Sequence, residues 1–346
     1  MSRAIPPNRK IRLVQIGFGH IGMRRTLLTR DHPGIDVVGV CDIKRERLNL
    51  AREVLGEDCA QDTSYLRLLA TVRPDAAIIS TPNALHGPMT LNTLRSGVHT
   101  LCEKPLTTNT VQGEQAVALA SSMGLVLKVG SNHRFWRGVR EILARIEAGD
   151  IGEVMGIDGE IGYRLPDVRS EWYREREVSG GGTIIDNTPH LLDVVNQILR
   201  VSDGDQIRSV RCATTHDALG LEVEDRAEGL LTSDKGRSIS LVSTWSEGEY
   251  RMNVDVQGTR GRISIAGFDH LTLETRDRTQ EWNFSDVPAA ESWEMDIQAF
   301  VDGIRFHVPL RGSGEEGLRC VRIIEALYRS SRRMAEEVTL QVPPRA

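Results

Sequence analysis

The sequence predicts an α/β domain of the Rossmann type, with a doubly wound parallel sheet, followed by an α+β domain. Apolar runs alternate with helical stretches over residues 11–129, and a Gly-x-Gly-x-x-Gly pattern directly follows the first of these runs. After about residue 130 the rhythm changes to longer strand-like runs. At 346 residues the chain is long enough for two domains. We expect them to be residues 1–131 and residues 132–346.

The first region has the composition of buried parallel strands joined by helices. Its apolar runs are rich in β-branched residues and barely alternate, as strands covered on both faces do. They are 11–16, 36–41, 76–80, 98–102 and 125–129. The segments between them, such as 44–55 and 108–123, show helical spacing with polar faces. Strand–helix alternation of this kind predicts a doubly wound parallel sheet.

The second region predicts a different sheet. Several of its strand-like runs alternate apolar and polar residues, which is typical of an antiparallel or mixed sheet with one exposed face. These runs are 151–163, 207–215, 225–232, 237–245, 251–257 and 261–266. A helical stretch at 136–149 precedes them, and two helical segments, about 292–306 and 314–335, follow late.

Composition and charge argue against several classes of protein. The formal charge is −5 and charges of both signs are mixed, so the chain offers no basic face to nucleic acid. No apolar run approaches the roughly 18–20 residues that cross a membrane. The first ten residues lack the hydrophobic segment of a secretory signal. Five scattered cysteines form no Cys-x-x-Cys pair, which predicts no disulfide scaffold or zinc cluster and favours a reducing cytoplasm.

The first motif with chemical meaning is Gly17-Phe18-Gly19-His20-Ile21-Gly22, between a predicted strand and a predicted helix. Gly17 allows a tight turn, Gly19 lets a pyrophosphate approach the backbone, and Gly22 lets the helix pack on the strand. The helix N-terminus offers free N–H groups and a partial positive charge to phosphates. The alternative is a glycine-rich turn beside a strand-end acid, without a ligand.

Asp42 ends the second apolar run, 20 residues after Gly22, where a carboxylate can accept hydrogen bonds from both ribose hydroxyls. Such an acid repels a 2′-phosphate, so we expect NAD rather than NADP as the cofactor. Lys44, Arg45 and Arg47 oppose this expectation, because an arginine can meet a 2′-phosphate.

Further candidates follow two other predicted strands. Glu103-Lys104-Pro105 follows the run 98–102, and Thr81-Pro82-Asn83 with His86 follows the run 76–80. Ligands of open α/β sheets bind beyond the carboxyl ends of strands, so these residues are expected around the nicotinamide. Lys104 would share a proton with a substrate oxygen there. The alternatives are a solvated strand-end lysine and a Pro-containing turn followed by a helix cap.

A third motif spans residues 180–193, where a helix is predicted after three glycines. Asp186 and His190 would lie four residues apart on one face, and Asp193 follows three residues later. Histidine titrates near neutral pH and a neighbouring carboxylate orients it, which is typical of proton transfer. The alternatives are a helix cap at Asp186, a core histidine satisfied by Asp193, and a metal site that lacks a complete ligand set.

The remaining candidate site residues lie near the predicted domain boundary and just before the glycine run. Arg134 lies in Ser131-Asn132-His133-Arg134-Phe135, and Trp172 with Tyr173 precedes the glycines. We expect Arg134 and Trp172 to contact substrate, although a structural role is equally open for the aromatic pair. Other arginines nearby favour an anionic substrate, whereas interleaved glutamates favour surface ion pairs; these arginines are Arg137, Arg164, Arg169, Arg174 and Arg176.

Taken together and in this order, the motifs resemble the glucose–fructose oxidoreductase/inositol dehydrogenase/MocA (Gfo/Idh/MocA) family. They are Gly17-x-Gly19-x-x-Gly22, Thr81-Pro82-Asn83-x-x-His86, Glu103-Lys104-Pro105 and Gly181-Gly182-x-x-x-Asp186-x-x-x-His190-x-x-Asp193. The resemblance covers residues 11 to 335 approximately. It implies a Rossmann domain, a second domain built on a large open mixed sheet, and oxidation or reduction of sugars, cyclitols or nucleotide-linked sugars with NAD or NADP.

Residue roles follow from the resemblance by position. Lys104 would be the lysine of the Glu-Lys-Pro motif, Asp186 the substrate-binding acid and His190 the proton-transfer histidine. One departure concerns the helix start, where Thr188 followed by Pro189 stands where the family often has glycine. That departure affects the expected substrate more than the expected chemistry.

We therefore expect reversible oxidation of a secondary alcohol on a polyhydroxylated substrate. Hydride would pass to C4 of the nicotinamide, His190 would accept the hydroxyl proton, and Lys104 would stabilise charge on the reacting oxygen. A non-catalytic dinucleotide-binding sensor on the same fold and a metal-dependent enzyme are the rival hypotheses. The resemblance also predicts a cis Lys104–Pro105 bond. An uncovered sheet face predicts a homo-oligomer. The resemblance implies a homodimer or homotetramer.

Overall fold

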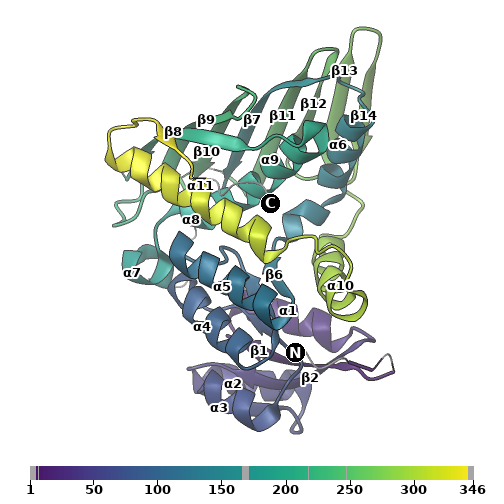
Figure 1. The fold of residues 1–346 in the computed structure, drawn as a ribbon, viewed down its shortest axis with the longest axis vertical. Coiled ribbons are helices and arrows are strands. Elements are labelled where there is room, and N and C mark those ends of the chain that lie inside the picture. Colours follow the sequence, from purple (N-terminus) through teal and green to yellow (C-terminus); the bar gives the residue numbers. More distant parts are fainter. Residues whose placement is uncertain (1–4, 7, 166–170, 217, 247, 342–346) are drawn as a thin grey trace. The chain divides into compact units, whose positions relative to one another are not determined.

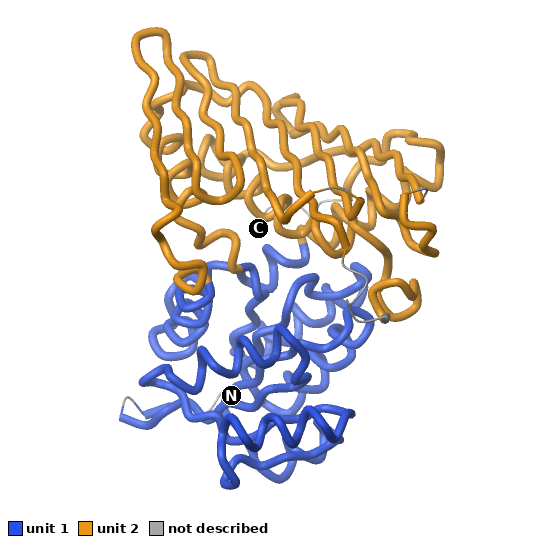
Figure 2. The backbone as a smooth tube through the Cα atoms, turned by 180° about the vertical axis from the view of Figure 1, so that it is seen from behind, with its two compact units in different colours: residues 1–131, 293–318 blue, residues 132–292, 319–346 orange. Residues whose placement is uncertain are grey.

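The computed structural model describes residues 5–6, 8–165, 171–216, 218–246 and 248–341. Contacts within the chain define two compact units, residues 1–131 with 293–318 and residues 132–292 with 319–346 (Figure 2). Residues 293–318, which we expected in the second region, group with the first unit. Within the described ranges, no helix combines the length and apolarity needed to cross a bilayer.

The first unit contains a six-stranded parallel sheet in the order β3-β2-β1-β4-β5-β6. This is the strand order of doubly wound dinucleotide-binding folds, so the predicted Rossmann sheet is confirmed. Strands β1, β2 and β6 are labelled in Figure 1. The strands are β1 (Ile11–Ile16), β2 (Ile35–Cys41), β3 (Ala60–Asp62), β4 (Ala76–Ile79), β5 (His99–Glu103) and β6 (Leu127–Gly130). The sequence did not predict β3, because Ala-Gln-Asp contains no apolar run.

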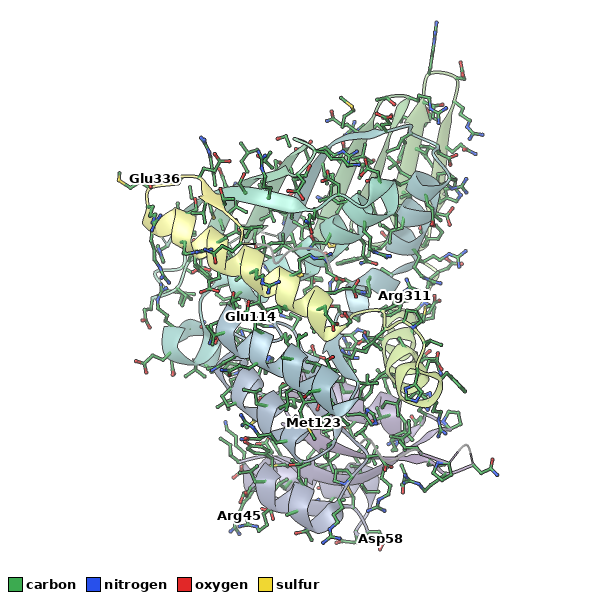
Figure 3. All side chains as sticks on the ribbon, viewed as in Figure 1. Arg45, Asp58, Glu114, Met123, Arg311 and Glu336 are labelled. Atoms are coloured by element: carbon green, nitrogen blue, oxygen red, sulfur yellow. The ribbon has the colours of Figure 1, made fainter. Side chains whose placement is uncertain are left out.

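Helices connect these strands, and local signals set several of their ends. Ser64 caps α3 by accepting the N–H of Arg67, and Asn109 caps α5 by accepting the N–H of Gln112. Helix α5 ends at Met123, labelled in Figure 3, because Gly124 takes a left-handed conformation with φ +62°. The helices are α1 (His20–Arg30), α2 (Arg45–Leu55), α3 (Tyr65–Val72), α4 (Asn83–Arg95) and α5 (Thr110–Met123).

From Trp293 onward, helix α10 (Ala290–Phe306) belongs to the first unit and packs on its sheet. Ile297, Phe300 and Ile304 recur at helical spacing and are buried in one cluster with Leu13 of β1 and Ile78 of β4. The helical period predicts an apolar stripe but not the sheet against which it packs. This is why we assigned the helix to the wrong region from the sequence.

The second unit contains a nine-stranded mixed sheet in the order β14-β13-β12-β11-β7-β10-β9-β8-β15. Strands β7 and β10 pair in parallel, and the other neighbours pair antiparallel. The predicted large mixed sheet is therefore confirmed. The strands are β7 (Val154–Gly162), β8 (Ile207–Thr215), β9 (Arg226–Ser233), β10 (Ser238–Thr244), β11 (Arg251–Gly258), β12 (Gly261–Ala266), β13 (His270–Thr275), β14 (Thr279–Asn283) and β15 (Val338–Thr339).

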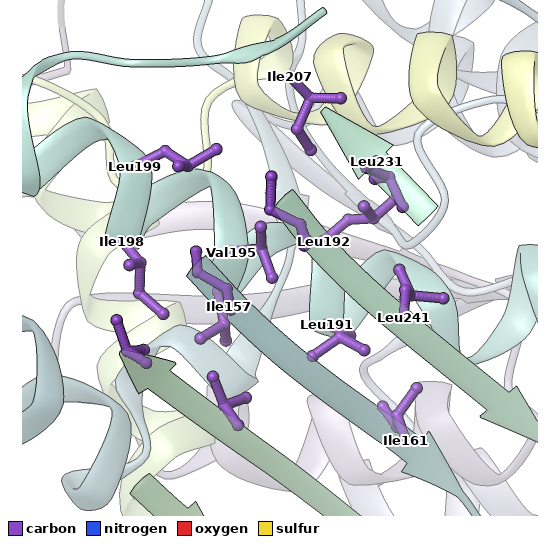
Figure 4. Close-up of a cluster of buried hydrophobic side chains, with 14 of the residues drawn as sticks. Ile157, Ile161, Leu191, Leu192, Val195, Ile198, Leu199, Ile207, Leu231 and Leu241 are labelled. Atoms are coloured by element: carbon purple, nitrogen blue, oxygen red, sulfur yellow. The ribbon is translucent and has the colours of Figure 1, made fainter. Parts of the chain in front are cut away.

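One face of this sheet packs against helices. Leu191 and Leu192 of α9 are buried with Ile157 and Ile161 of β7 in the core shown in Figure 4. The described helices of the unit are η1 (Asn132–Phe135), α6 (Arg137–Glu147), η2 (Glu171–Arg174), α7 (Arg176–Ser179), α8 (Thr183–Asp186), α9 (Thr188–Asp203) and the later part of α11 (Gly314–Arg332).

The other face of the sheet is polar and more open. Along β11 the side chains of Met252, Val254 and Val256 are buried, whereas the alternating Asn253, Asp255 and Gln257 are half-buried or exposed. This alternation is what a sheet with one helix-covered face produces.

Candidate active site

The glycine-rich turn of the first unit has the geometry of a phosphate cradle. Gly17 has φ +86°, and a Cβ there would lie 2.5 Å from the carbonyl oxygen of Ser80. A Cβ at Gly22 would lie 2.0 Å from the carbonyl oxygen of Gly17. Near Gly19 the closest atoms belong to the flexible Arg47 side chain, at 3.6 to 3.9 Å. Gly17 and Gly22 are therefore required by the turn itself, while the backbone of Gly19 is open to a pyrophosphate.

Helix α1 begins directly after this turn, at His20, with Gly19 at its N-cap. The N–H groups of its first turn have no partner within the helix, so they and the helix dipole favour an anionic group at this point. The predicted residues Phe18, His20 and Ile21 complete the turn and the first turn of the helix. The site fits the diphosphate of a dinucleotide.

Asp42 lies directly after β2 and is nearly fully buried. Its Oδ2 accepts the Phe18 N–H at 2.7 Å, and its Oδ1 accepts the Lys44 N–H at 2.9 Å. The Arg47 guanidinium lies 3.2 Å from Oδ2. A carboxylate has about four lone-pair sites, and these three contacts leave about one of them, on Oδ1, for a ribose hydroxyl unless Arg47 moves away. Arg47 partly balances the charge that repels a 2′-phosphate.

His86 connects two of the predicted segments. Its Nε2 lies 2.9 Å from the Thr81 carbonyl oxygen, and its Nδ1 lies 2.7 Å from the Pro105 carbonyl oxygen. Burial lowers the pKa of His86, although the two carbonyl oxygens oppose that shift. His86 thus holds the loop with Thr81, Pro82 and Asn83 against the loop after β5, which is a positioning role.

Glu103, the residue before Lys104, lies in a buried charge network. Its Oε1 accepts from Nε of Arg25 at 2.7 Å. Asp296 of α10 lies 2.6 Å from Arg25 Nη1 and 2.6 Å from Nζ of Lys128 on β6. Burial alone would raise the pKa of Asp296, but the two cations outweigh it and lower that pKa. The sequence did not predict this network, because its members lie on elements far apart in the chain.

Lys104 follows directly, and its peptide bond to Pro105 is cis, as we predicted. The residue belongs to the first unit, at the carboxyl edge of the parallel sheet where a dinucleotide binds. Asp186 and His190 belong to the second unit.

In the second unit, Gly181 and Gly182 allow the backbone to pass close to Glu224, whose carboxylate is buried. A Cβ at Gly182 would lie 1.9 Å from the Glu224 carbonyl oxygen, and one at Gly181 would lie 1.9 Å from Oη of Tyr328. Oε1 of Glu224 accepts the N–H groups of Gly182 at 2.9 Å and Ile184 at 3.1 Å, and the Tyr328 hydroxyl at 2.7 Å. Glu224 thus fixes the start of α8, and no sequence pattern pointed to it.

Asp186 ends α8 and is buried. Its Oδ2 accepts the Tyr163 hydroxyl at 2.8 Å and the indole N–H of Trp245 at 3.2 Å. The expected single helix is interrupted here: α8 stops at Asp186, and α9 begins at Thr188 with Pro189 in its first turn. The break after Asp186 coincides with Pro189, which has no backbone N–H to continue the hydrogen-bond pattern of α8.

Asp193 has a partner that the spacing did not suggest. Its two oxygens pair with the guanidinium of Arg134, including an Nε–Oδ2 hydrogen bond of 3.0 Å, and both side chains are buried. Arg134 is therefore neutralised within the protein, which argues against its predicted role as the group that binds an anionic substrate.

His190 lies in the first turn of α9 and stacks on His133 of η1, with ring centroids 3.7 Å apart and planes at 29°. Nε2 of His133 lies 2.6 Å from the Tyr250 hydroxyl. The sequence drew attention to the segment around His133 but assigned no role to His133 or Tyr250. Trp172 stacks on Tyr173 at 3.8 Å, and Tyr173 in turn meets the edge of Trp245.

Two of the arginines that favoured an anionic substrate have partners within the protein, and Arg174 is half-buried. Arg176 pairs with Glu222 at 3.9 Å, and Arg137 lies over the ring of Phe284. Arg164 is exposed, and Arg169 lies outside the described residues. Among the side chains that the structure describes, no group of three His, Cys, Asp or Glu residues is placed to hold a metal ion.

Comparisons with known proteins agree with this geometry. Residues 11–131 match the oxidoreductase family GFO_IDH_MocA with its NAD-binding Rossmann fold, and residues 139–264 match the GFO/IDH/MocA C-terminal domain. The chain is 25% identical over 327 residues to D-xylose 1-dehydrogenase (NADP(+)) 2 of Haloferax volcanii, covering 91% of this chain and 96% of that protein. It is 27% identical over 311 residues to dTDP-3,4-didehydro-2,6-dideoxy-alpha-D-glucose 3-reductase of Streptomyces violaceoruber, covering 86% of each.

The fold is also that of a solved inositol dehydrogenase homolog from Azotobacter vinelandii in complex with NAD⁺. The two structures align with a TM-score of 0.83 at 19% identity, over 96% of this chain and 98% of that one. The Rossmann sheet, the phosphate cradle beside Asp42 and the two family matches lead to one conclusion. The chain belongs to the GFO/IDH/MocA family of NAD(P)-dependent oxidoreductases, and NAD is its cofactor.

Proposed function

We propose that this chain transfers hydride between NAD and a secondary alcohol or ketone carbon of a sugar, a cyclitol or a sugar nucleotide. The observation that carries the proposal is the buried turn of the second unit, which holds Asp186 and His190 four residues apart. Asp186 is fixed by Tyr163 and Trp245, and His190 is fixed by the ring of His133. A fixed acid and a fixed imidazole suit a substrate with adjacent hydroxyl groups.

When bound, the nicotinamide supplies a hydride acceptor at its C4 atom. A ring nitrogen of His190 takes the hydroxyl proton while the hydride leaves the same carbon, so an alcohol and NAD⁺ give a ketone, NADH and a protonated imidazole. Lys104 donates a hydrogen bond to the reacting oxygen and stabilises its developing charge. Asp186 accepts a hydrogen bond from a neighbouring hydroxyl and orients the substrate.

The substrate class is supported by the relatives. One is named as a dehydrogenase of D-xylose and the other as a reductase of a dTDP-linked dideoxy sugar, so both names place the reaction on a sugar. Arg134 is already paired with Asp193, so we favour a neutral sugar or cyclitol over a sugar acid. We also propose a homo-oligomer that buries the open sheet face.

The test is a screen of purified protein and NAD⁺ against a panel of free sugars, cyclitols, sugar acids and nucleotide sugars, with NADH absorbance as the readout. Turnover of at least one neutral polyol supports the proposal. NADH binding without turnover of any member would instead identify a dinucleotide-binding sensor. Preferred turnover of sugar acids would contradict the neutral substrate.

A further inference from the structure

His133 and His190 form a stacked pair inside the second unit. His133 lies in η1 and His190 in the first turn of α9, and both rings are nearly fully buried. Their centroids are 3.7 Å apart. Phe268 meets the edge of His133 at 5.3 Å and Trp136 does so at 6.4 Å, so His133 is held from the sides as well.

A chain of hydrogen bonds determines which nitrogen of His133 carries the proton. The Ser292 hydroxyl donates to the Ala289 carbonyl oxygen at 3.1 Å, and its oxygen accepts from Nδ2 of Asn132 at 3.3 Å. This orientation directs Oδ1 of Asn132 at Nδ1 of His133, 3.2 Å away. An amide oxygen can only accept, so Nδ1 is the donor and carries a hydrogen.

The other nitrogen of His133 is then an acceptor. It faces the Tyr250 hydroxyl at 2.6 Å, which donates its proton to Nε2. With Nδ1–H held by Asn132, a second proton can enter only at Nε2, and the Tyr250 hydroxyl must then turn from donor to acceptor. These hydrogen bonds therefore favour neutral His133 in the Nδ1–H tautomer.

We propose that His133 is a positioning residue for His190: its neutral ring fixes the plane of the His190 ring and leaves His190 as the member of the pair that takes a proton. The inference rests on the proposed role of His190. Two imidazolium rings stacked at this distance would repel strongly, whereas an imidazolium on the face of a neutral ring is stabilised. Proton uptake by His190 therefore depends on the neutrality of His133.

The charged and titratable groups around the pair come from several elements. Arg134 on η1 is balanced by Asp193 on α9, and Asp186 on α8 is held by the Tyr163 hydroxyl. Tyr250 precedes β11 and contacts His133 itself. Next to it, Arg251 of β11 pairs with Glu160 of β7. Arg134 and Arg251 are thus each balanced by a carboxylate among the described residues.

The first test is kinetic and compares His133→Ala with His133→Phe. His133→Ala removes the stacked ring, so we expect kcat to fall on the order of 100-fold while the KM and the NADH dissociation constant change little. His133→Phe keeps a neutral ring and should restore most of the lost activity. Equal losses in both variants, or a loss confined to KM, would overturn the positioning role.

The second test separates neutrality from packing. Tyr250→Phe frees Nε2 of His133 to take a proton, so the acid limb of the kcat–pH profile should move to higher pH by about one unit. In a His133→Phe background the same change should leave the limb in place, because no ring at position 133 can then titrate. An unmoved limb in the single variant, or an equal shift in both backgrounds, would contradict the inference.

A third measurement does not require catalysis. Nitrogen NMR of histidine-labelled protein, with the His133 signals assigned from the His133→Phe spectrum, should show the Nδ1–H tautomer near neutral pH. The Nε2–H tautomer or an imidazolium would overturn the inference. If His190→Asn retains full activity, the proposed function fails, whereas the tautomer of His133 is still decided by this spectrum.

Discussion

The guanidinium of Arg134 pairs with the carboxylate of Asp193, and both side chains are buried within the second unit. Removing one partner of such a pair leaves the other as an uncompensated buried charge. We expect Asp193→Asn to lower the free energy of unfolding by about 3–5 kcal/mol. Arg30→Ala, which breaks the exposed pair with Asp31, is the control and should leave the denaturation midpoint unchanged. Equal midpoints for Asp193→Asn and the wild type would show that the pair is not a stabilising element.

Cofactor choice should depend on Asp42, whose carboxylate is fixed beside the glycine-rich turn by the N–H groups of Phe18 and Lys44. Asp42→Ala removes the acceptor that we propose for a ribose hydroxyl and leaves Arg47 without its counter-charge. We expect NADH to bind roughly tenfold more weakly and NADPH to bind more tightly, as measured by calorimetric titration. Glu46→Ala, at an exposed position in the first turn of α2, is the matched control. Tighter binding of NADPH than NADH by the wild type would refute the expected preference.

Stability should fall at mildly acidic pH because of His99. Burial lowers the pKa of His99 from 6.5 to about 4, and its Nδ1 accepts the N–H of Val126 at 2.9 Å. The unfolded chain binds a proton near pH 6.5, and the folded chain does so only near pH 4. The free energy of unfolding is therefore unaffected by His99 above pH 6.5. It decreases as the pH falls from 6.5 to 4, by about 3 kcal/mol in all.

The measurement is urea denaturation across that pH window for the wild type and for His99→Asn. Asparagine offers an oxygen to Val126 but does not titrate, so the slope of unfolding free energy against pH should be shallower in the variant. Parallel slopes would mean that His99 does not contribute to the pH dependence.

The open face of the nine-stranded sheet should form a contact between copies of the chain. Leu230 of β9 is 49% exposed, among polar neighbours such as Glu228 and Thr232 on the same face. We expect Leu230→Lys to weaken self-association, since it places a charge in that contact. The measurement is sedimentation velocity of the wild type and of Leu230→Lys at micromolar concentration. A wild type that sediments only as a monomer would refute the expected oligomer.

The sequence predicted the elements that have strong local signals. The parallel strands of the first unit are apolar and β-branched, and Gly17 and Gly22 are glycines because neighbouring backbone atoms leave no room for a Cβ. Helix α10 shows the limit of this reasoning, because Ile297 and Phe300 predict an apolar stripe without indicating the sheet on which it packs. The short β3 was missed because it has no apolar run.

The candidate site was predicted only in part, because some of its residues carry no local signal in the sequence. Asp186 and His190 lie in a recognisable motif, whereas Glu224, His133 and Tyr250 reach them only through tertiary contacts. Spacing drew attention to Asp193 beside His190, but it gave no sign that Arg134, a residue distant in sequence, binds that carboxylate. Local patterns thus identify reactive side chains, and only the fold shows which groups fix them.

The central claim is tested most directly by the rate of NADH formation from the best neutral polyol with the wild type and with His190→Asn. A general base contributes about 10²–10⁴-fold to a rate, so we expect kcat to fall by that factor in the variant. The NADH dissociation constant should stay the same, because the cradle around Gly19 and Asp42 is unaltered. A variant that turns over the polyol as fast as the wild type would contradict the account.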